Sequence, residues 1–184
     1  SYPSVIYSVM ISTNIGGSNM AFDGITISGI KAELNELMSG CRVDKIYQPE
    51  PLSIVMNLRK MRDSYKLLLS AHSVYAHICL TKAEFQKPKS TPLYCMVLRK
   101  HLEGSKILSF EQPSMERLIK IRVESRTELG EITYKCLIIE TMGKHSNIIL
   151  LDEVETKIID SIKRVPPSTS QVRQVLPGKA YSFP

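Results

Sequence analysis

The residues best suited to contact another molecule lie in the segment MGKHSN, residues 142–147, directly before an apolar run. Gly143 permits a backbone conformation or a close approach that a side chain would block. Lys144 contributes a point charge, and His145 and Asn147 contribute hydrogen-bond donors and acceptors at a predicted strand entrance. This combination suits a phosphate-rich or polar macromolecular ligand. A crowded β-turn whose side chains bond their own backbone is the alternative, and the chemistry of the residues leaves both open.

A second group of basic residues lies in LRKHLEG, residues 98–104, where Arg99, Lys100 and His101 follow one another on a predicted helix. Consecutive helical residues point in different directions, so at most two of the three share a face. The pattern fits a nucleic-acid contact or an ordinary solvated helix face.

Two further segments carry charged candidates. In SMERLIK, residues 114–120, Glu116 and Arg117 lie at a predicted loop-to-strand boundary. An isolated surface ion pair contributes little stability, so physics alone does not single this pair out. In QVRQVLPGKAY, residues 171–181, Arg173 either contacts phosphate or pins the tail to the domain.

The sequence lacks the motifs of a self-contained enzyme. It has no GxxxxGKS phosphate loop, no GxGxxG, no GxSxG elbow and no HExxH. No spacing brings an acid, a base and a nucleophile together, because the histidines are scattered over His72, His77, His101 and His145. We therefore expect a protein without catalytic residues. The hairpin with Ser70, His72 and Tyr75 is interpreted as a turn that satisfies its own backbone.

Cysteine spacing and charge exclude further classes. The four cysteines form no CxxC pair and have no histidine at ligand spacing, which predicts buried free thiols and no metal site, disulfide framework or cofactor: Cys41, Cys79, Cys95 and Cys136. The net charge of +6 is compatible with an anionic partner such as nucleic acid and also with an ordinary solvated surface. No apolar run approaches the roughly 18 residues of a membrane span, so we expect a soluble, intracellular protein.

The first half of the chain predicts one helix and a strand meander. Residues 22–41 place apolar residues at helical spacing and end near Gly40, a suitable C-terminal cap: Ile27, Ile30, Leu34 and Leu37. From residue 42 to residue 81 the pattern predicts four antiparallel strands, RVDKIYQ, SIVMNLR, YKLLLSA and AHICLT.

The second half predicts one more helix and about five strands. Residues 90–104 offer Ser90 or Thr91 as N-cap, Pro92 in the first turn and Gly104 as the stop, with buried positions at Leu93, Met96, Val97 and Leu102. The strands follow as KILSFEQ, RLIKIRVES, ITYKCLIIE, SNIILLD and KIIDSIKRV. Because the order has no βαβ rhythm, we expect an α+β domain with two antiparallel sheets.

Both ends of the sequence differ from this pattern. Residues 1–19 carry no charge and contain Gly-Gly-Ser-Asn before Met20, which favours a leader or a non-native start, with the natural chain opening at Met20. The tail from Val165 to Pro184 is rich in Pro, Ser and Gly and is interpreted as an extended strap leading to further modules. We therefore expect the chain to be a fragment.

Five blocks carry a family resemblance: MAFDGITISGIKAELN, KLLLSAH, CMVLRKHLEG, IIETMGKHSNIIL and VRQVLPGKAY. They resemble, in order and spacing, the N-terminal (NFACT-N) domain of the RqcH proteins, also known as fibronectin-binding protein A-like proteins. The resemblance runs from Met20 to the end and implies one domain over residues 20–184.

The resemblance implies a role in ribosome-associated quality control. Family members bind a stalled 50S subunit that still holds a peptidyl-tRNA, recruit alanyl-tRNA and direct a template-free C-terminal alanine tail, which implies a cytoplasmic, ribosome-associated protein. The implied fold is an antiparallel β-sandwich with flanking helices, similar to the N-terminal domain of the formamidopyrimidine DNA glycosylases. Their N-terminal proline nucleophile is absent from the start Met20-Ala21-Phe22-Asp23, so glycosylase chemistry is not expected.

The resemblance also assigns candidate tRNA-binding residues. The Asp-Arg pair that the family needs for tRNA recruitment falls on Glu116 and Arg117, with the acid longer by one methylene. MGKHSN is a family signature, which favours a functional surface over a crowded turn. The predicted basic surface comprises Arg99, Lys100, Arg117, Lys144, His145, Asn147 and Arg173, together with Glu116.

The fibronectin-binding name offers a second function, an adhesin-type module with a pool on the cell surface. The sequence shows no secretion signal and no anchor motif, which favours the ribosomal role.

Overall fold

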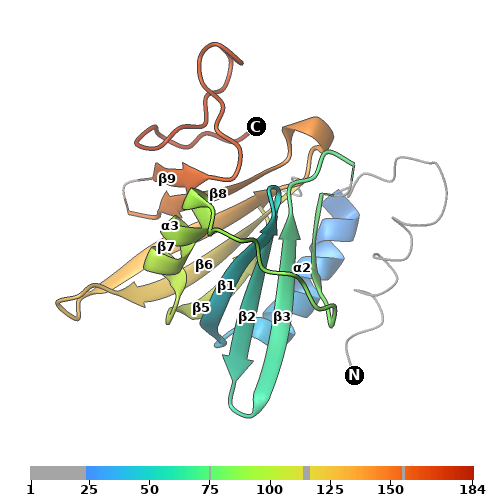
Figure 1. The fold of residues 1–184 in the computed structure, drawn as a ribbon, viewed down its shortest axis with the longest axis vertical. Coiled ribbons are helices and arrows are strands. Elements are labelled where there is room, and N and C mark those ends of the chain that lie inside the picture. The colour runs from blue at the N-terminus through green and yellow to red at the C-terminus, as the bar shows by residue number, and fades with distance from the viewer. Residues whose placement is uncertain (1–23, 75, 114–116, 155) are drawn as a thin grey trace.

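The computed structural model describes residues 24–74, 76–113, 117–154 and 156–184 (Figure 1). These residues form two α-helices, one short 3₁₀ helix and a nine-stranded sheet of order β4-β3-β2-β1-β5-β6-β7-β8-β9. The elements are α2 (Gly24–Met38), β1 (Arg42–Glu50), β2 (Ser53–Lys60), β3 (Asp63–Ser70), β4 (His77–Leu80), α3 (Leu93–Leu102), β5 (Lys106–Glu111), β6 (Leu118–Arg126), β7 (Ile132–Glu140), η2 (Gly143–His145), β8 (Asn147–Asp152) and β9 (Lys157–Ser161). The predicted segment 1–19, Met20, Tyr75 and Glu116 lie outside the described residues.

Every neighbouring pair of strands is antiparallel, which confirms the predicted strand direction and the predicted number of strands and helices. The prediction of two separate sheets is wrong. β1 and β5 join the two halves into one sheet through a single paired position, Arg42 with Lys106, and through nearby bonds such as Val43 N to Ser105 O at 2.9 Å. The sequence pattern of each strand does not reveal this junction, because pairing depends on where the chain returns in space.

One apolar core lies between the two halves of the sheet. β3 and β8, from opposite halves, contact each other, and the largest buried cluster draws side chains from both. Helix α2 packs on β5 and β6 through the buried Leu34 and Met38. Its Asn35 side chain bonds the backbone of Phe110 twice, with both distances at 2.6 Å. The fold therefore buries its core as a sandwich would, although the sheet is continuous.

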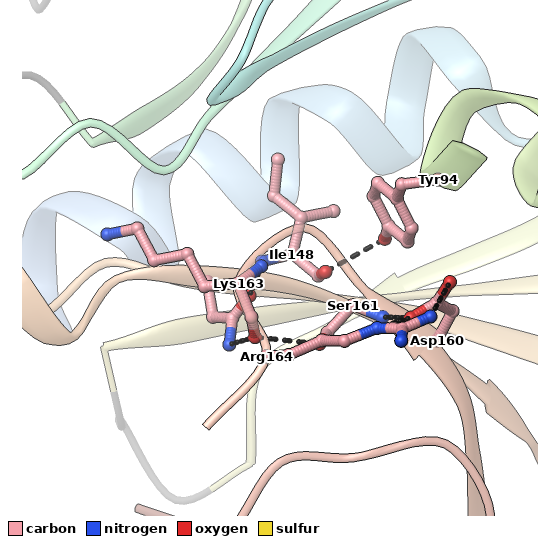
Figure 2. Close-up of polar contacts among 7 residues, drawn as sticks. Tyr94, Ile148, Asp160, Ser161, Lys163 and Arg164 are labelled. Atoms are coloured by element: carbon pink, nitrogen blue, oxygen red, sulfur yellow. Dashed lines mark hydrogen bonds and ion pairs between the residues drawn. The ribbon is translucent and has the colours of Figure 1, made fainter. Parts of the chain in front are cut away.

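Helix α3 buries Leu102 as predicted and packs Val97 partly against the core, but the rest of its buried face differs from the prediction. Pro92 is its N-cap and no side chain caps it, so neither Ser90 nor Thr91 plays that role. The buried residues are Tyr94, Cys95, Leu98 and Leu102, whereas Leu93 and Met96 are exposed. This difference is explained by Tyr94, whose side chain extends into the core and whose hydroxyl donates a hydrogen bond to Ile148 O at 2.8 Å (Figure 2). Burial of the Tyr94 ring, with its hydroxyl paired in the core, therefore decided which face of α3 is buried, and the number of aliphatic residues on a face did not.

The tail, residues 165–184, folds back onto the domain, whereas the sequence predicted an extended segment that leads away from it. A second apolar cluster on the other face of β6–β9 consists of Leu118, Cys136, Ile138, Ile149, Leu151, Ile158 and Val175. Val165 and Tyr181 pack against it, and backbone bonds such as Ile158 N to Lys179 O at 2.8 Å hold the tail in place. We call residues 165–184 the strap. Figure 1 shows them looping beside β9.

The cysteines agree with the prediction, since all four are free and buried. Burial raises the pKa of Cys79 and of Cys136 to about 12. No group of His, Cys, Asp or Glu within the described ranges could hold a metal ion. The helices that the structure describes are all too short or too polar to cross a membrane.

Candidate nucleic-acid interface

The MGKHSN segment forms the tight η2 turn between β7 and β8. Gly143 has φ of +57°, and a Cβ there would lie 3.8 Å from Ser73 O, so the turn lies beside the loop between β3 and β4. Ser146 is buried and its hydroxyl accepts the Met142 N–H at 2.8 Å. Lys144 and His145 are exposed. The segment is thus a turn that satisfies its own backbone on its inner side and exposes Lys144 and His145 on its outer side.

Asn147 lies in the interior, 3% exposed. Its Oδ1 accepts from Lys163 N at 3.0 Å and from Ile148 N at 2.9 Å, and its Nδ2 donates to Lys163 O at 2.9 Å. The side chain therefore fixes the backbone that follows β9 against the start of β8. The structure gives Asn147 a positioning role for its neighbours.

Lys163 is a cation that the sequence analysis missed. Its Nζ donates to Lys144 O at 3.4 Å, so the two lysines are adjacent. In Figure 2 its side chain extends away from Asp160 and Arg164. Partial burial lowers the pKa of Lys163. The pairing of β8 with β9, continued by the bond from Ile162 N to Ile148 O, and the bonds between Asn147 and residue 163 bring this lysine here, and no local motif marks it.

Arg117 lies at the same end of the sheet. Its carbonyl accepts from Thr141 N at 2.9 Å and Thr141 Oγ1 at 3.1 Å, which places the start of β6 beside the chain that leads into η2. Arg117 is exposed. Glu116, its predicted acidic partner, lies outside the described residues. We call Arg117, Lys144, His145 and Lys163 together the basic end.

Two acids near the basic end are neutralised internally. Glu140, fully buried, receives Arg173 Nη1 at 3.0 Å, Arg173 Nη2 at 2.7 Å and the Tyr181 hydroxyl at 2.7 Å. Burial, followed by the Glu140 charge, raises the pKa of Tyr181. Asp160 accepts Arg164 Nε at 3.2 Å and Arg164 Nη2 at 3.3 Å (Figure 2). Among the described residues, these two acids therefore bond to Arg173, Tyr181 and Arg164 and not to Arg117 or the lysines of this end.

The remaining predicted residues lie elsewhere. Arg173 directs its guanidinium inward and also donates to Ser182 O at 2.9 Å, so it pins the strap. Arg99 lies against β1, where its Nε donates to Ile46 O at 2.8 Å. Lys100 is exposed near the C-terminal end of α3. The neighbouring His101 has its pKa lowered by burial and by Lys135, which belongs to the far end of β7.

The fold and the basic end define an antiparallel domain that presents exposed cations around a glycine turn. The family model described as NFACT N-terminal and middle domains matches residues 23–184, and the chain belongs to this family.

Curated relatives include two classes of quality-control protein. The chain is 42% identical to the Rqc2 homolog RqcH of Bacillus subtilis over 165 residues, which cover 90% of this chain and 29% of that relative. It is 29% identical to the human ribosome quality control complex subunit NEMF over 131 residues, which cover 71% of this chain and 11% of NEMF. The chain is therefore homologous to ribosome quality control factors and spans less than a third of their length.

Solved structures show the same fold. The N-terminal domain of fibronectin-binding protein PavA from Streptococcus pneumoniae superposes with a TM-score of 0.86 at 41% identity, covering 89% of this chain and 62% of that one. The fibrinogen binding protein from Staphylococcus aureus superposes with a TM-score of 0.78 at 38% identity, covering 90% and 57%.

Proposed function

We propose that this chain is a non-catalytic RNA-binding domain of a ribosome quality control factor. It contacts tRNA through the basic end and supports template-free alanine tailing on the stalled 50S subunit. The observation that carries the proposal is the convergence of Arg117, Lys144, His145 and Lys163 from three separate segments on one end of the sheet.

The charges at this end suit a phosphate backbone. Phosphate contacts come mainly from Arg, Lys and polar side chains, and they position a protein without reading sequence. Because Glu140 and Asp160 are already paired, they do not offset the exposed cations. In this proposal Arg173 and Asn147 act by holding the strap and the β8 entrance in place. The likeness to the glycosylase domain stays a prediction and implies no glycosylase activity.

The direct test is tRNA binding by this chain, measured by fluorescence anisotropy at about 50 mM and 200 mM salt. Each neutralised phosphate contributes about 0.9 to the slope of log affinity against log salt for duplex nucleic acid, and less for single strands. Arg117→Ala and Lys144→Ala should each lower that slope by roughly 1 or slightly less. Glu116→Ala tests the acid of the predicted pair in the same assay.

Arg62→Ala provides the matched control, because Arg62 is exposed in the turn between β2 and β3. That turn and the loop with Ser73 lie at opposite ends of β3. Affinity that does not change with salt would overturn the proposal. So would an Arg62→Ala effect as large as that of Arg117→Ala.

A second candidate function, fibronectin binding by an adhesin-type module, is favoured by the likeness to the PavA domain. It predicts saturable binding of this chain to immobilised fibronectin in surface plasmon resonance. It also predicts that antibodies to this domain label intact cells. A lack of both signals would exclude it as a physiological role.

A further inference from the structure

A cavity of about 260 Å³ lies apart from the basic end, between β1, the first turn of α3 and the segment that joins β4 to α3. In Figure 1 that segment passes across β1, and Lys87 Nζ lies 4.7 Å from the centroid of the Tyr47 ring. Tyr47, Gln48, Lys87, Thr91, Cys95 and Arg99 are among the lining residues. The predicted RNA-binding residue Arg99 thus belongs to a site of its own.

Two cations meet in this cavity. Arg99 Cζ lies 5.9 Å from the same Tyr47 centroid that Lys87 approaches, so both charges gather around one ring. Arg99 is held in place by its Nε bond to Ile46 O at 2.8 Å and an Nη1 contact with Thr91 Oγ1 at 3.5 Å. Glu103 forms an ion pair with Arg99, with its Oε1 3.8 Å from Nε, and offsets part of the Arg99 charge from outside the cavity. Nη2 donates to none of the described residues and remains available to an anion.

The N-terminus of α3 adds to this positive environment. The N-cap residue is Pro92, and no side chain accepts a hydrogen bond from the N–H groups of the first turn. Such groups at a helix start favour a negative charge. Thr91, Pro92 and Cys95, which flank or form this turn, all line the cavity.

We propose that this cavity binds a small phosphomonoester, such as a nucleotide. Two cations and a helix N-terminus match a phosphomonoester, whose charge is about −1.5 to −2, better than they match a singly charged carboxylate. The volume lies just below the common ligand range of about 300–1,000 Å³, so the cavity accommodates the phosphate and part of one sugar or base. This inference goes beyond the proposed function, because the basic end takes no part in it.

The test measures binding of adenosine 5′-monophosphate, sulfate and adenosine to this chain by isothermal titration calorimetry and NMR shift mapping. The nucleotide and sulfate should both bind, and adenosine should bind far more weakly. Lys87→Ala should weaken the nucleotide and sulfate by about tenfold, since a hydrogen bond to a charged group is lost. Lys89→Ala is the matched control, because Lys89 is exposed on the same segment and does not line the cavity.

A 5′-phosphorylated RNA oligonucleotide compared with its 5′-hydroxyl form distinguishes an RNA end from a free nucleotide, and Lys87-dependent binding of either supports the site.

Two results would overturn the inference: a nucleotide dissociation constant above about 10 mM, or equal effects of Lys87→Ala and Lys89→Ala. Lys144→Ala should leave nucleotide binding unchanged. A failure at the basic end is thereby distinguished from a failure here.

Discussion

At the basic end Lys144 and His145 are exposed, whereas four residues before Lys144 the Glu140 carboxylate is completely buried beneath the strap. The two regions handle charge in opposite ways. Arg117 is exposed to solvent, while the Arg173 guanidinium is paired with Glu140 at 2.7 Å and 3.0 Å. Residues of the same type thus differ in their environment: the buried pair of Arg173 with Glu140 holds the strap on the domain, whereas Arg117 is exposed where a partner could reach it.

The sharpest test of this contrast is Glu140→Ala. It leaves the Arg173 charge and the Tyr181 hydroxyl without their partner in a buried position, and breaking a buried pair costs about 3–5 kcal/mol of unfolding free energy. Urea denaturation measures the loss. Glu128→Ala, at an exposed position in the β6–β7 turn, should change stability by less than about 0.5 kcal/mol. Equal losses of unfolding free energy in Glu140→Ala and Glu128→Ala would contradict the contrast between the two regions.

The same contrast between a buried, hydrogen-bonded residue and an exposed one recurs within MGKHSN, between Asn147 and His145. Asn147→Ala removes three hydrogen bonds and leaves buried backbone groups unpaired, so it should cost about 1–3 kcal/mol. His145→Ala, at an exposed position, should stay within about 0.5 kcal/mol. Thermal or urea unfolding of both variants decides the matter. If His145→Ala proved the more destabilising, the inner and outer sides of the turn would have to be reassigned.

Lys163→Met tests whether the basic end contributes to tRNA binding. Because this lysine adjoins Lys144, its loss should lower the salt slope of tRNA binding by about 1. Folding should be little affected, since the aliphatic part of the side chain is retained. Lys179→Met, an exposed change on the strap, should leave the slope as it is. An unchanged slope in Lys163→Met would remove this residue from the basic end.

The smallest expected effect concerns pH. Burial, Lys135 and Lys100 lower the pKa of His101, so below the ordinary histidine pKa of about 6.5 the unfolded chain binds the proton more readily. Stability should therefore fall as pH drops through that value and level off below the folded pKa. His101→Gln should flatten urea stability between about pH 7.5 and pH 5. A parent-like slope in His101→Gln would contradict the assignment.

Part of the site could be predicted and part could not. Local pattern located the glycine turn and the exposed Lys144, because these depend on residues adjacent in sequence. Arg173 remained open between ligand and anchor, since its partner Glu140 lies 33 residues away. The sequence analysis missed the position of Lys163 beside Lys144 and missed the cavity between β1 and α3, because packing of distant segments creates both.

The sequence by itself determined the alternation of strands and two helices, the free thiols and the family, since periodicity, spacing and motif order are local properties. Only the tertiary structure decided that the two halves form one sheet, that α3 turns Tyr94 inward and that the strap returns to cover β6–β9. The physical reason is that burial and pairing are settled between segments far apart in the chain. Which charges remain for a partner depends on which ones the fold has already neutralised.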